Sequence, residues 1–112
     1  IAFNTLGRFI LIVENNGAIA NMQDDAMVEV VCELGINGPR PMSVGNIPQF
    51  YLGLLVQQVS SEKLLVDAYY EHSYQKALEA FTLNRLINDA KVARKILDAL
   101  IEANKGMWPE LK

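Results

Sequence analysis

The sequence predicts an α+β fold in which short antiparallel strands in the N-terminal third are followed by three helices. Before Gly45, apolar residues come in short runs or alternate, and asparagine, glycine and proline separate these runs. Beyond Gly45, apolar residues recur at helical spacing. Runs of strands followed by runs of helices are typical of α+β architecture. At 112 residues, the chain predicts a single domain with one core.

The first predicted strand covers residues 9–13, a run of branched and aromatic side chains. Gly7-Arg8 precedes this run, and Asn15-Asn16-Gly17 follows it. A continuous apolar run is typical of a strand buried on both faces. We therefore expect other elements to pack above and below this strand.

The second predicted strand covers residues 28–34, where valine, cysteine and leucine alternate with glutamate and Val31. This period of two predicts one buried and one largely solvated face. Asn37-Gly38 then predicts a hairpin turn that returns residues 40–44 antiparallel to this strand. Pro39 and Pro41 lack an N–H to donate, so we expect the third strand at an edge of the sheet.

Three helices are predicted in the remainder of the chain. The first begins near Asn46 and Pro48 and continues to about Tyr70. Ser73 is expected to cap the second helix, and Asn88 or Asp89 the third. The apolar stripe expected on the third helix consists of Val92, Ile96, Ala99, Leu100 and Ala103.

Composition excludes several classes of protein. The net charge is −3 and no basic run is present, which argues against a nucleic-acid partner. No apolar segment approaches the ~20 residues of a membrane span. Cys32 is the single cysteine, so an internal disulfide is impossible, as expected in a reducing cytoplasm. The apolar content is high for so short a chain, so we expect some surface to meet a partner.

The sequence contains few candidates for catalysis or metal binding. His72 is the single histidine, and no ligand stands at a familiar spacing from it, so a solvent-facing or capping role is favoured over a metal site. Cys32 is interpreted as a small buried apolar residue rather than a nucleophile. Asp24-Asp25 is interpreted as a turn or cap rather than a catalytic carboxylate pair.

The remaining single residues are interpreted in the same way. Arg40 and Arg85 have the chemistry to bind phosphate, but isolated arginines are more often surface residues. Trp108 is expected to be a packing anchor against the body of the protein or a neighbour.

The order of the motifs resembles the C-terminal part of the family 4 glycoside hydrolases. The matching motifs are Val13–Ile19, Asp25–Val30, Asn37-Gly38-Pro39, Pro41, Val44-Gly45 and Pro48. Further motifs are similar to the 6-phospho-α-glucosidase branch of that family: Gln57-Gln58-Val59, Glu62-Lys63-Leu64, Leu97-Asp98 and Trp108–Leu111. The sequence departs at Asn21-Met22-Gln23, where many relatives have asparagine, leucine and proline.

The resemblance implies a fold and a reaction for a longer parent enzyme. The chain, residues 1–112, would be a single partial domain, part of the lactate-dehydrogenase-like C-terminal domain of the family. The NAD-binding domain would lie outside this chain. The parent would use NAD and Mn²⁺ to hydrolyse a phosphorylated disaccharide by oxidation and elimination, an exception to the usual two-carboxylate scheme. The start at Ile1 is interpreted as internal to that enzyme.

The resemblance assigns no catalytic, cofactor-binding or metal-binding residue to this chain. The family's glycine-rich NAD loop, Cys-Asn motif, metal histidine and tyrosine base all precede the matched region. The expected partners are therefore the remainder of the parent enzyme and further copies in a homo-oligomer. The chain alone is expected to be inactive.

Asn15, Asn16 and Gly17 form the one candidate site loop. These residue types accept the left-handed backbone of a sharp turn. In the family's setting, the loop is expected either near the sugar pocket or at a subunit contact. Two alternatives for the whole chain stay open: a fragment of a related 6-phospho-β-glucosidase, or a freestanding protein-interaction module.

Overall fold

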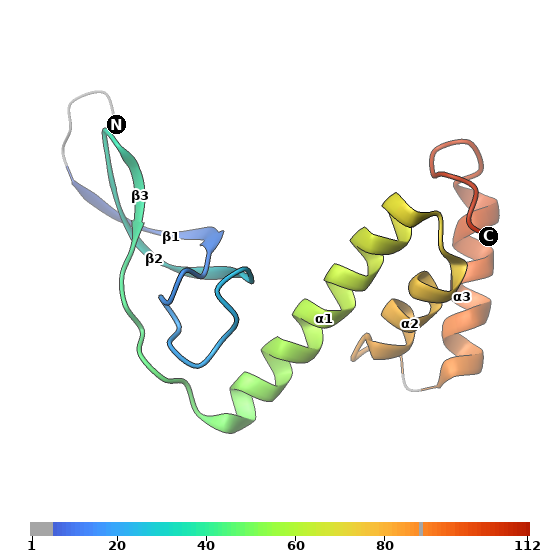
Figure 1. Ribbon diagram of the computed structural model, residues 1–112, viewed down its shortest axis with the longest axis horizontal. Coiled ribbons are helices and arrows are strands. Elements are labelled where there is room, and N and C mark those ends of the chain that lie inside the picture. The colour runs from blue at the N-terminus through green and yellow to red at the C-terminus, as the bar shows by residue number, and fades with distance from the viewer. Residues whose placement is uncertain (1–5, 88) are drawn as a thin grey trace. The chain divides into compact units, whose positions relative to one another are not determined.

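The computed structural model describes residues 6–87 and 89–112, and it contains three strands followed by three helices (Figure 1). The strands are β1 (Gly7–Glu14), β2 (Met27–Gly35) and β3 (Gly38–Pro41). The helices are α1 (Gln49–Glu71), α2 (Tyr74–Leu83) and α3 (Ala90–Ala103). Contacts divide the chain into two compact units, one ending at Gly53 and the other covering Leu54–Lys112. The predicted α+β class is confirmed.

The first unit contains an antiparallel sheet in the order β1-β2-β3. β2 is central, and its side chains alternate as expected: Val28, Val30 and Cys32 are buried, whereas Glu29 and Val31 are exposed. Phe9 lies opposite Cys32 and Leu11 opposite Val30. The buried side chains of β2 therefore face the same side of the sheet as the odd-numbered residues of β1.

The prediction that the first strand is covered on both faces is wrong for the described chain. Ile10 and Ile12 are 65% and 69% exposed, and Phe9 is 53% exposed. The apolar run correctly indicated a strand. It did not indicate which atoms cover that strand. A sequence pattern shows that a side chain prefers to be buried, but not which part of the protein buries it.

The hairpin is confirmed, but its turn and third strand begin earlier than predicted. Gly35 pairs with Gly38, so residues 36–37 form the loop and the strand covers Gly38–Pro41 instead of residues 40–44. Gly38 has a φ of 91°, which glycine adopts without strain. β3 lies at an edge of the sheet, as its two prolines predicted.

The predicted helices are confirmed with small shifts at their ends. The Leu52 amide donates to the Pro48 carbonyl at 3.1 Å, which places Pro48 at the start of α1. Ser73 caps α2 by accepting a hydrogen bond from the Lys76 amide. Asp89 caps α3, with Oδ1 at 2.7 Å from the Lys91 nitrogen and 3.1 Å from that of Val92. The alternative cap, Asn88, lies outside the described residues.

The second unit has a small core in which all three of its helices participate. Ala68, Ala77 and Leu97 are buried at its centre, and larger side chains pack around them: Tyr74, Leu78, Phe81, Ile101 and Leu111. The small side chain of Ala77 lets the backbones of α2 and α3 approach closely.

The apolar stripe predicted for α3 is wrong by one position. The residues that face the core are Ala93, Leu97 and Ile101. The members of the predicted stripe are exposed: Val92, Ile96, Ala99, Leu100 and Ala103. Both sets recur at helical spacing, so the pattern alone did not indicate which apolar face meets α2.

Candidate functional site

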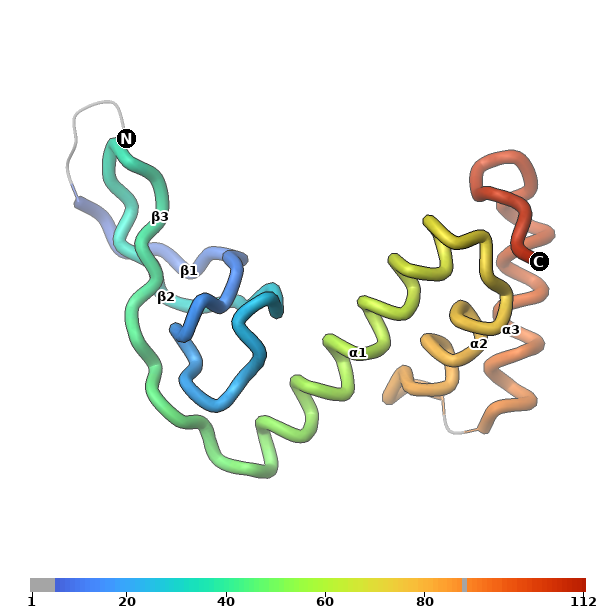
Figure 2. Tube along the Cα trace, in the orientation of Figure 1, coloured from blue at the N-terminus to red at the C-terminus, as the bar shows by residue number. Residues whose placement is uncertain are grey.

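The connection between β1 and β2 is the loop singled out by the sequence, and we define residues 15–26 as the Asn15 loop (Figure 2). Asn15 is fully buried at its base. Its Nδ2 donates to the carbonyls of Ile19, Met22 and Gln23 at 3.0, 3.2 and 3.1 Å, and its Oδ1 accepts from the Ile19 amide at 2.7 Å. One side chain therefore fixes the path of the loop.

Asn16 and Gly17 form the exposed turn at the start of this loop. Their φ angles are 40° and 81°, in the left-handed region that asparagine and glycine tolerate. The Asn16 side chain donates to Glu14 Oε2 at 3.2 Å, and its backbone amide donates to the Asp24 carbonyl at 2.9 Å. Asp24 and Asp25 lie in a turn, as predicted.

The far side of the Asn15 loop is attached to the segment that follows β3. The Asn21 side chain makes two hydrogen bonds with the backbone of Ile47. Asn21 Nδ2 donates to the Ile47 carbonyl at 2.9 Å, and the Ile47 amide donates to Asn21 Oδ1 at 3.0 Å. Ile19 forms a parallel bridge with Gly45, and the Ala20 amide donates to the Gly45 carbonyl at 2.9 Å. The loop is therefore held at its base by Asn15 and at its far side by Asn21.

A small ionic cluster lies on the other face of the sheet from the buried β2 side chains. Glu33 of β2 accepts from Arg40 of β3, and Arg8 of β1 lies 3.6 Å from the same carboxylate. The hydrogen bond from Arg40, together with its positive charge, lowers the pKa of Glu33. Arg40 is thus occupied by an ion pair, which agrees with a surface role rather than a phosphate site. Arg85 is exposed.

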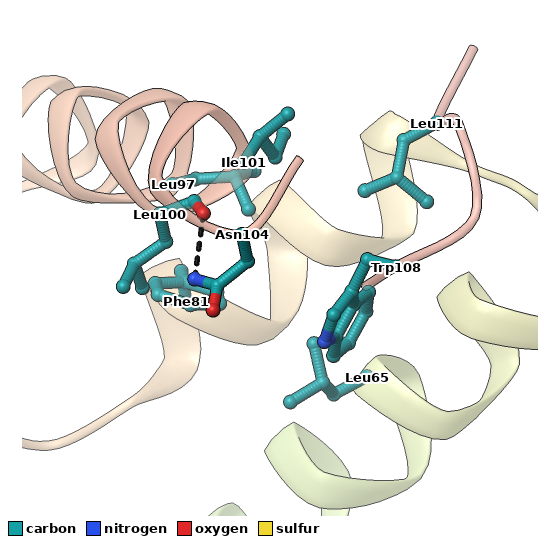
Figure 3. A pocket seen from close by; sticks show the side chains of 8 residues that line it. All are labelled: Leu65, Phe81, Leu97, Leu100, Ile101, Asn104, Trp108 and Leu111. Atoms are coloured by element: carbon teal, nitrogen blue, oxygen red, sulfur yellow. Dashed lines mark hydrogen bonds between the residues drawn. The ribbon is translucent and has the colours of Figure 1, made fainter. Parts of the chain in front are cut away.

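An apolar cavity of about 240 Å³ lies in the helical unit (Figure 3). Its walls come from all three helices and the C-terminal tail: Leu65, Phe81, Leu97, Leu100, Ile101, Asn104, Trp108 and Leu111. The side-chain amide of Asn104 donates to the Leu100 carbonyl at 2.8 Å. The lining offers no charged group to a reaction.

The C-terminal tail is fastened to the junction of α1 and α2. The Lys112 amide donates to the His72 carbonyl at 2.8 Å, and the Tyr74 amide donates to the Lys112 carbonyl at 3.0 Å. Trp108 makes an edge-to-face contact with Tyr69 at 5.5 Å between ring centres, so its predicted role as a packing anchor is confirmed.

His72 is exposed, as predicted for a solvent-facing residue at a helix junction. Its Nδ1 lies 3.3 Å from the Glu110 carbonyl, and its φ is 56°. Cys32 is completely buried, in agreement with its interpretation as a small apolar residue. Neither lies in a candidate catalytic arrangement.

Two pairs of polar groups connect the helices of the second unit. The Tyr74 hydroxyl donates to Asp98 at 2.7 Å, and this hydrogen bond raises the pKa of Tyr74. Lys76 Nζ donates to Glu71 Oε1 at 2.6 Å, which raises the pKa of Lys76. Both arrangements are structural links at the surface.

Within the described ranges, histidine, cysteine, aspartate and glutamate form no group of three that could hold a metal ion. None of the described helices is long and apolar enough to cross a membrane. What the sequence reasoning missed is the extent of exposed apolar surface on the sheet. The signal was present in the apolar run of residues 9–13, but that run was interpreted as buried.

The described residues thus present a loop held by Asn15, a sheet with exposed apolar side chains and a helical unit with a small apolar cavity. Residues 1–87 match the model of the family 4 glycosyl hydrolase C-terminal domain. The chain therefore belongs to the family 4 glycosyl hydrolases.

The relatives identify a branch of that family. The chain is 57% identical over 112 residues to the maltose-6'-phosphate glucosidase of Fusobacterium mortiferum, and 59% identical over 111 residues to that of Bacillus subtilis. It spans 25% of the length of each of these curated relatives, and they cover 100% and 99% of this chain. A probable 6-phospho-β-glucosidase of Bacillus subtilis is more distant, at 43% identity over 96 residues.

Solved structures confirm the fold. A 6-phospho-α-glucosidase from gut microorganisms, crystallised with NAD and Mn²⁺, is 88% identical with a TM-score of 0.97, and the match covers 100% of this chain and 26% of that one. The 6-phospho-β-glucosidase of Thermotoga maritima, with NAD and glucose-6-phosphate, is 28% identical with a TM-score of 0.83 over 91% of this chain and 25% of that one.

Proposed function

We propose that this chain is the C-terminal portion of an NAD- and Mn²⁺-dependent 6-phospho-α-glucosidase, in which it has a structural and oligomerisation role. The observation that carries this proposal is the match of the whole chain, at 57% and 59% identity, to a quarter of two maltose-6'-phosphate glucosidases. The lower identity to the β-glucosidase relative favours the α-anomer.

The substrate of the parent enzyme would be a phosphorylated disaccharide, and its cofactors would be NAD and Mn²⁺. We expect the metal of the parent to be held outside this chain, since its described histidine, cysteine, aspartate and glutamate side chains form no group of three that could hold a metal ion. A lone buried cysteine agrees with a cytoplasmic location for the enzyme.

Within this portion, the Asn15 loop is proposed to face the sugar pocket or a subunit contact. Asn15 uses its amide inside the loop, so any outward contact would come from Asn16 and Gly17. The rigid attachment of the loop supports this role, since a preorganised surface loses little entropy when it binds.

A chimeric enzyme tests the proposed function. The matched C-terminal quarter of the Bacillus subtilis maltose-6'-phosphate glucosidase is replaced by this chain, and hydrolysis of nitrophenyl 6-phosphoglucosides is measured with NAD and Mn²⁺. We expect the chimera to hydrolyse the α-anomer, whereas the same enzyme without its C-terminal quarter and the isolated chain are both inactive.

Two results would contradict the proposal. One is a folded chimera that binds NAD yet hydrolyses neither anomer. The other is hydrolysis by the isolated chain. Asn16→Gly in the chimera distinguishes the two placements of the loop: a raised KM places Asn16 near the sugar, whereas an altered oligomer mass with unchanged KM places it at a contact between subunits.

A further inference from the structure

The two edges of the sheet differ in their capacity to bind another strand. Pro39 and Pro41 lie in β3 at one edge, whereas β1 at the other edge contains no proline. Among residues 6–87 and 89–112, no strand lies beyond β1. An unprotected edge is a template for strand addition.

Backbone hydrogen bonds establish which backbone groups face each edge. The Met42 amide donates to the Val31 carbonyl at 2.9 Å, so the odd-numbered residues of β2 bond toward β3 and the even-numbered ones toward β1. In the observed register, even-numbered residues of β2 pair with odd-numbered residues of β1. The Asn15 amide, which donates to the Ala26 carbonyl at 2.8 Å, continues the same alternation.

The outward backbone groups follow from this alternation. In β1 they belong to the even-numbered residues: Arg8, Ile10, Ile12 and Glu14. All four have an N–H to donate. In β3, the outward positions are Pro39 and Pro41, which have none. The β3 edge is therefore blocked, whereas the β1 edge has no paired strand within the described residues.

The sequence of β1 is complementary to itself in the antiparallel direction. If Leu11 lies opposite Leu11 of a second copy, Arg8 meets Glu14, Phe9 meets Val13, and Ile10 meets Ile12. This register pairs outward residues with outward residues, as an antiparallel ladder requires. It also pairs a positive with a negative side chain at each end of the two strands and apolar side chains between them. Cross-strand pairs of both kinds stabilise sheets.

The apolar face of the sheet would continue across such a junction. Ile10 lies opposite Val31 within the chain, and both are exposed on the same face. In the joined sheet, Ile10 and Ile12 of the two copies would lie side by side at the centre. Paired strands would also reduce the exposure of the strand that the sequence predicted to be buried.

We propose that the outer edge of β1 pairs antiparallel with the same edge of a second copy of this chain, which joins two three-stranded sheets into one. The self-complementary charges of Arg8 and Glu14 favour a second copy as the occupant of this edge. This inference rests on the proposed function, because the second copy belongs to the oligomer proposed there.

Charge reversal tests the pairing by sedimentation velocity over a dilution series. We expect the wild-type chain to form a species of twice its 12.5 kDa mass. Arg8→Glu and Glu14→Arg each place like charges across both ends, and each should raise the dissociation constant roughly ten- to a hundredfold. The double variant, or an equal mixture of the two single variants, should restore the dimer.

Arg40→Glu is the matched control. It also removes an arginine from Glu33, but it lies on the blocked edge, so it should leave the dimer unchanged. Circular dichroism of each variant verifies that its fold is retained.

Cross-linking gives a second measurement that does not depend on charge. In a Cys32→Ala background, Leu11→Cys places two thiols opposite each other in a non-hydrogen-bonded pair, so oxidation should give a disulfide-linked dimer. Val13→Cys, on the same face of the same strand, should not cross-link because its counterpart is Phe9.

A monomeric wild-type chain would overturn the inference and favour a strand of the parent enzyme at this edge. A dimer insensitive to both reversals, or single variants that fail to recombine, would also overturn it. Activity of the chimera is a separate readout, so loss of this dimer leaves the proposed function standing.

Discussion

Removal of the Asn15 side chain should destabilise the first unit more than any change at the neighbouring exposed residue. Asn15→Ala eliminates three donor contacts to carbonyls and one acceptor contact, all inside the buried base of the loop. The two amide hydrogens serve three carbonyls, so about three hydrogen bonds are lost, each contributing about 1 kcal/mol. The buried Ile19 amide, left without its acceptor, adds a desolvation cost. We expect a loss of about 3 to 5 kcal/mol in the free energy of unfolding.

Asn15→Asp separates hydrogen bonding from shape. Aspartate has the same size, but its second oxygen would face the carbonyls of Ile19, Met22 and Gln23. The variant should therefore be destabilised at neutral pH and should recover in part as acid protonates the carboxyl group, because its pKa would be raised by burial. The control is Asn16→Gly, which removes an exposed side chain at a positive φ and should change stability by less than about 0.5 kcal/mol.

Equilibrium urea unfolding, followed by circular dichroism, measures these differences. Hydrogen exchange of residues 15–30 shows whether the loss is local to the loop and β2. If the free energy of unfolding of Asn15→Ala is within about 0.5 kcal/mol of that of the wild type, the side-chain amide of Asn15 does not organise the loop and the reasoning fails.

Three further predictions concern the helical unit. Asp89→Ala should cost about 1 kcal/mol because it removes the cap of α3, whereas Asp89→Asn should be nearly neutral; equal losses in thermal unfolding would contradict the capping role. Trp108→Ala should cost about 2 kcal/mol, because the ring is 42% exposed yet pairs with Tyr69, and Trp108→Phe should recover most of this loss in a urea titration. The hydrogen bond from Tyr74 to Asp98 raises the pKa of Tyr74 above its ordinary 10.0, so its stabilisation is present below pH 10 and is lost as pH rises through the raised pKa. Tyr74→Phe should therefore flatten the alkaline decline in stability, and an unchanged decline would exclude this pair as a cause.

Local signals in the sequence predicted elements well where the physics is local. Ser73 and Asp89 lie at caps because their side chains accept hydrogen bonds from the first helical amides. Pro39 and Pro41 indicated an edge strand because a missing N–H is a property of the residue itself. The left-handed turn at Asn16 and Gly17 follows from the same kind of local preference.

Features that depend on distant atoms were not predictable. The buried face of α3 was wrong by one position because its core contacts come from α1 and α2, and two apolar faces compete on one helix. The candidate loop was identified, but the bonds of Asn15 to Ile19, Met22 and Gln23 were not, because nothing in that spacing predicts a buried amide. Exposure of β1 likewise depends on surroundings that the strand's own residues do not specify.

The hydrogen bonds that the Asn15 side chain makes within the loop all go to main-chain atoms, and this has an evolutionary consequence. Substitutions at solvent-facing positions such as Ala20 and Asp24 leave those main-chain acceptors in place. The outer surface of the loop is therefore free to diversify while its course is conserved. A library randomised at such positions would retain the fold and sample new contacts, as long as Asn15 and Asn21, whose side chains hold the loop, are kept.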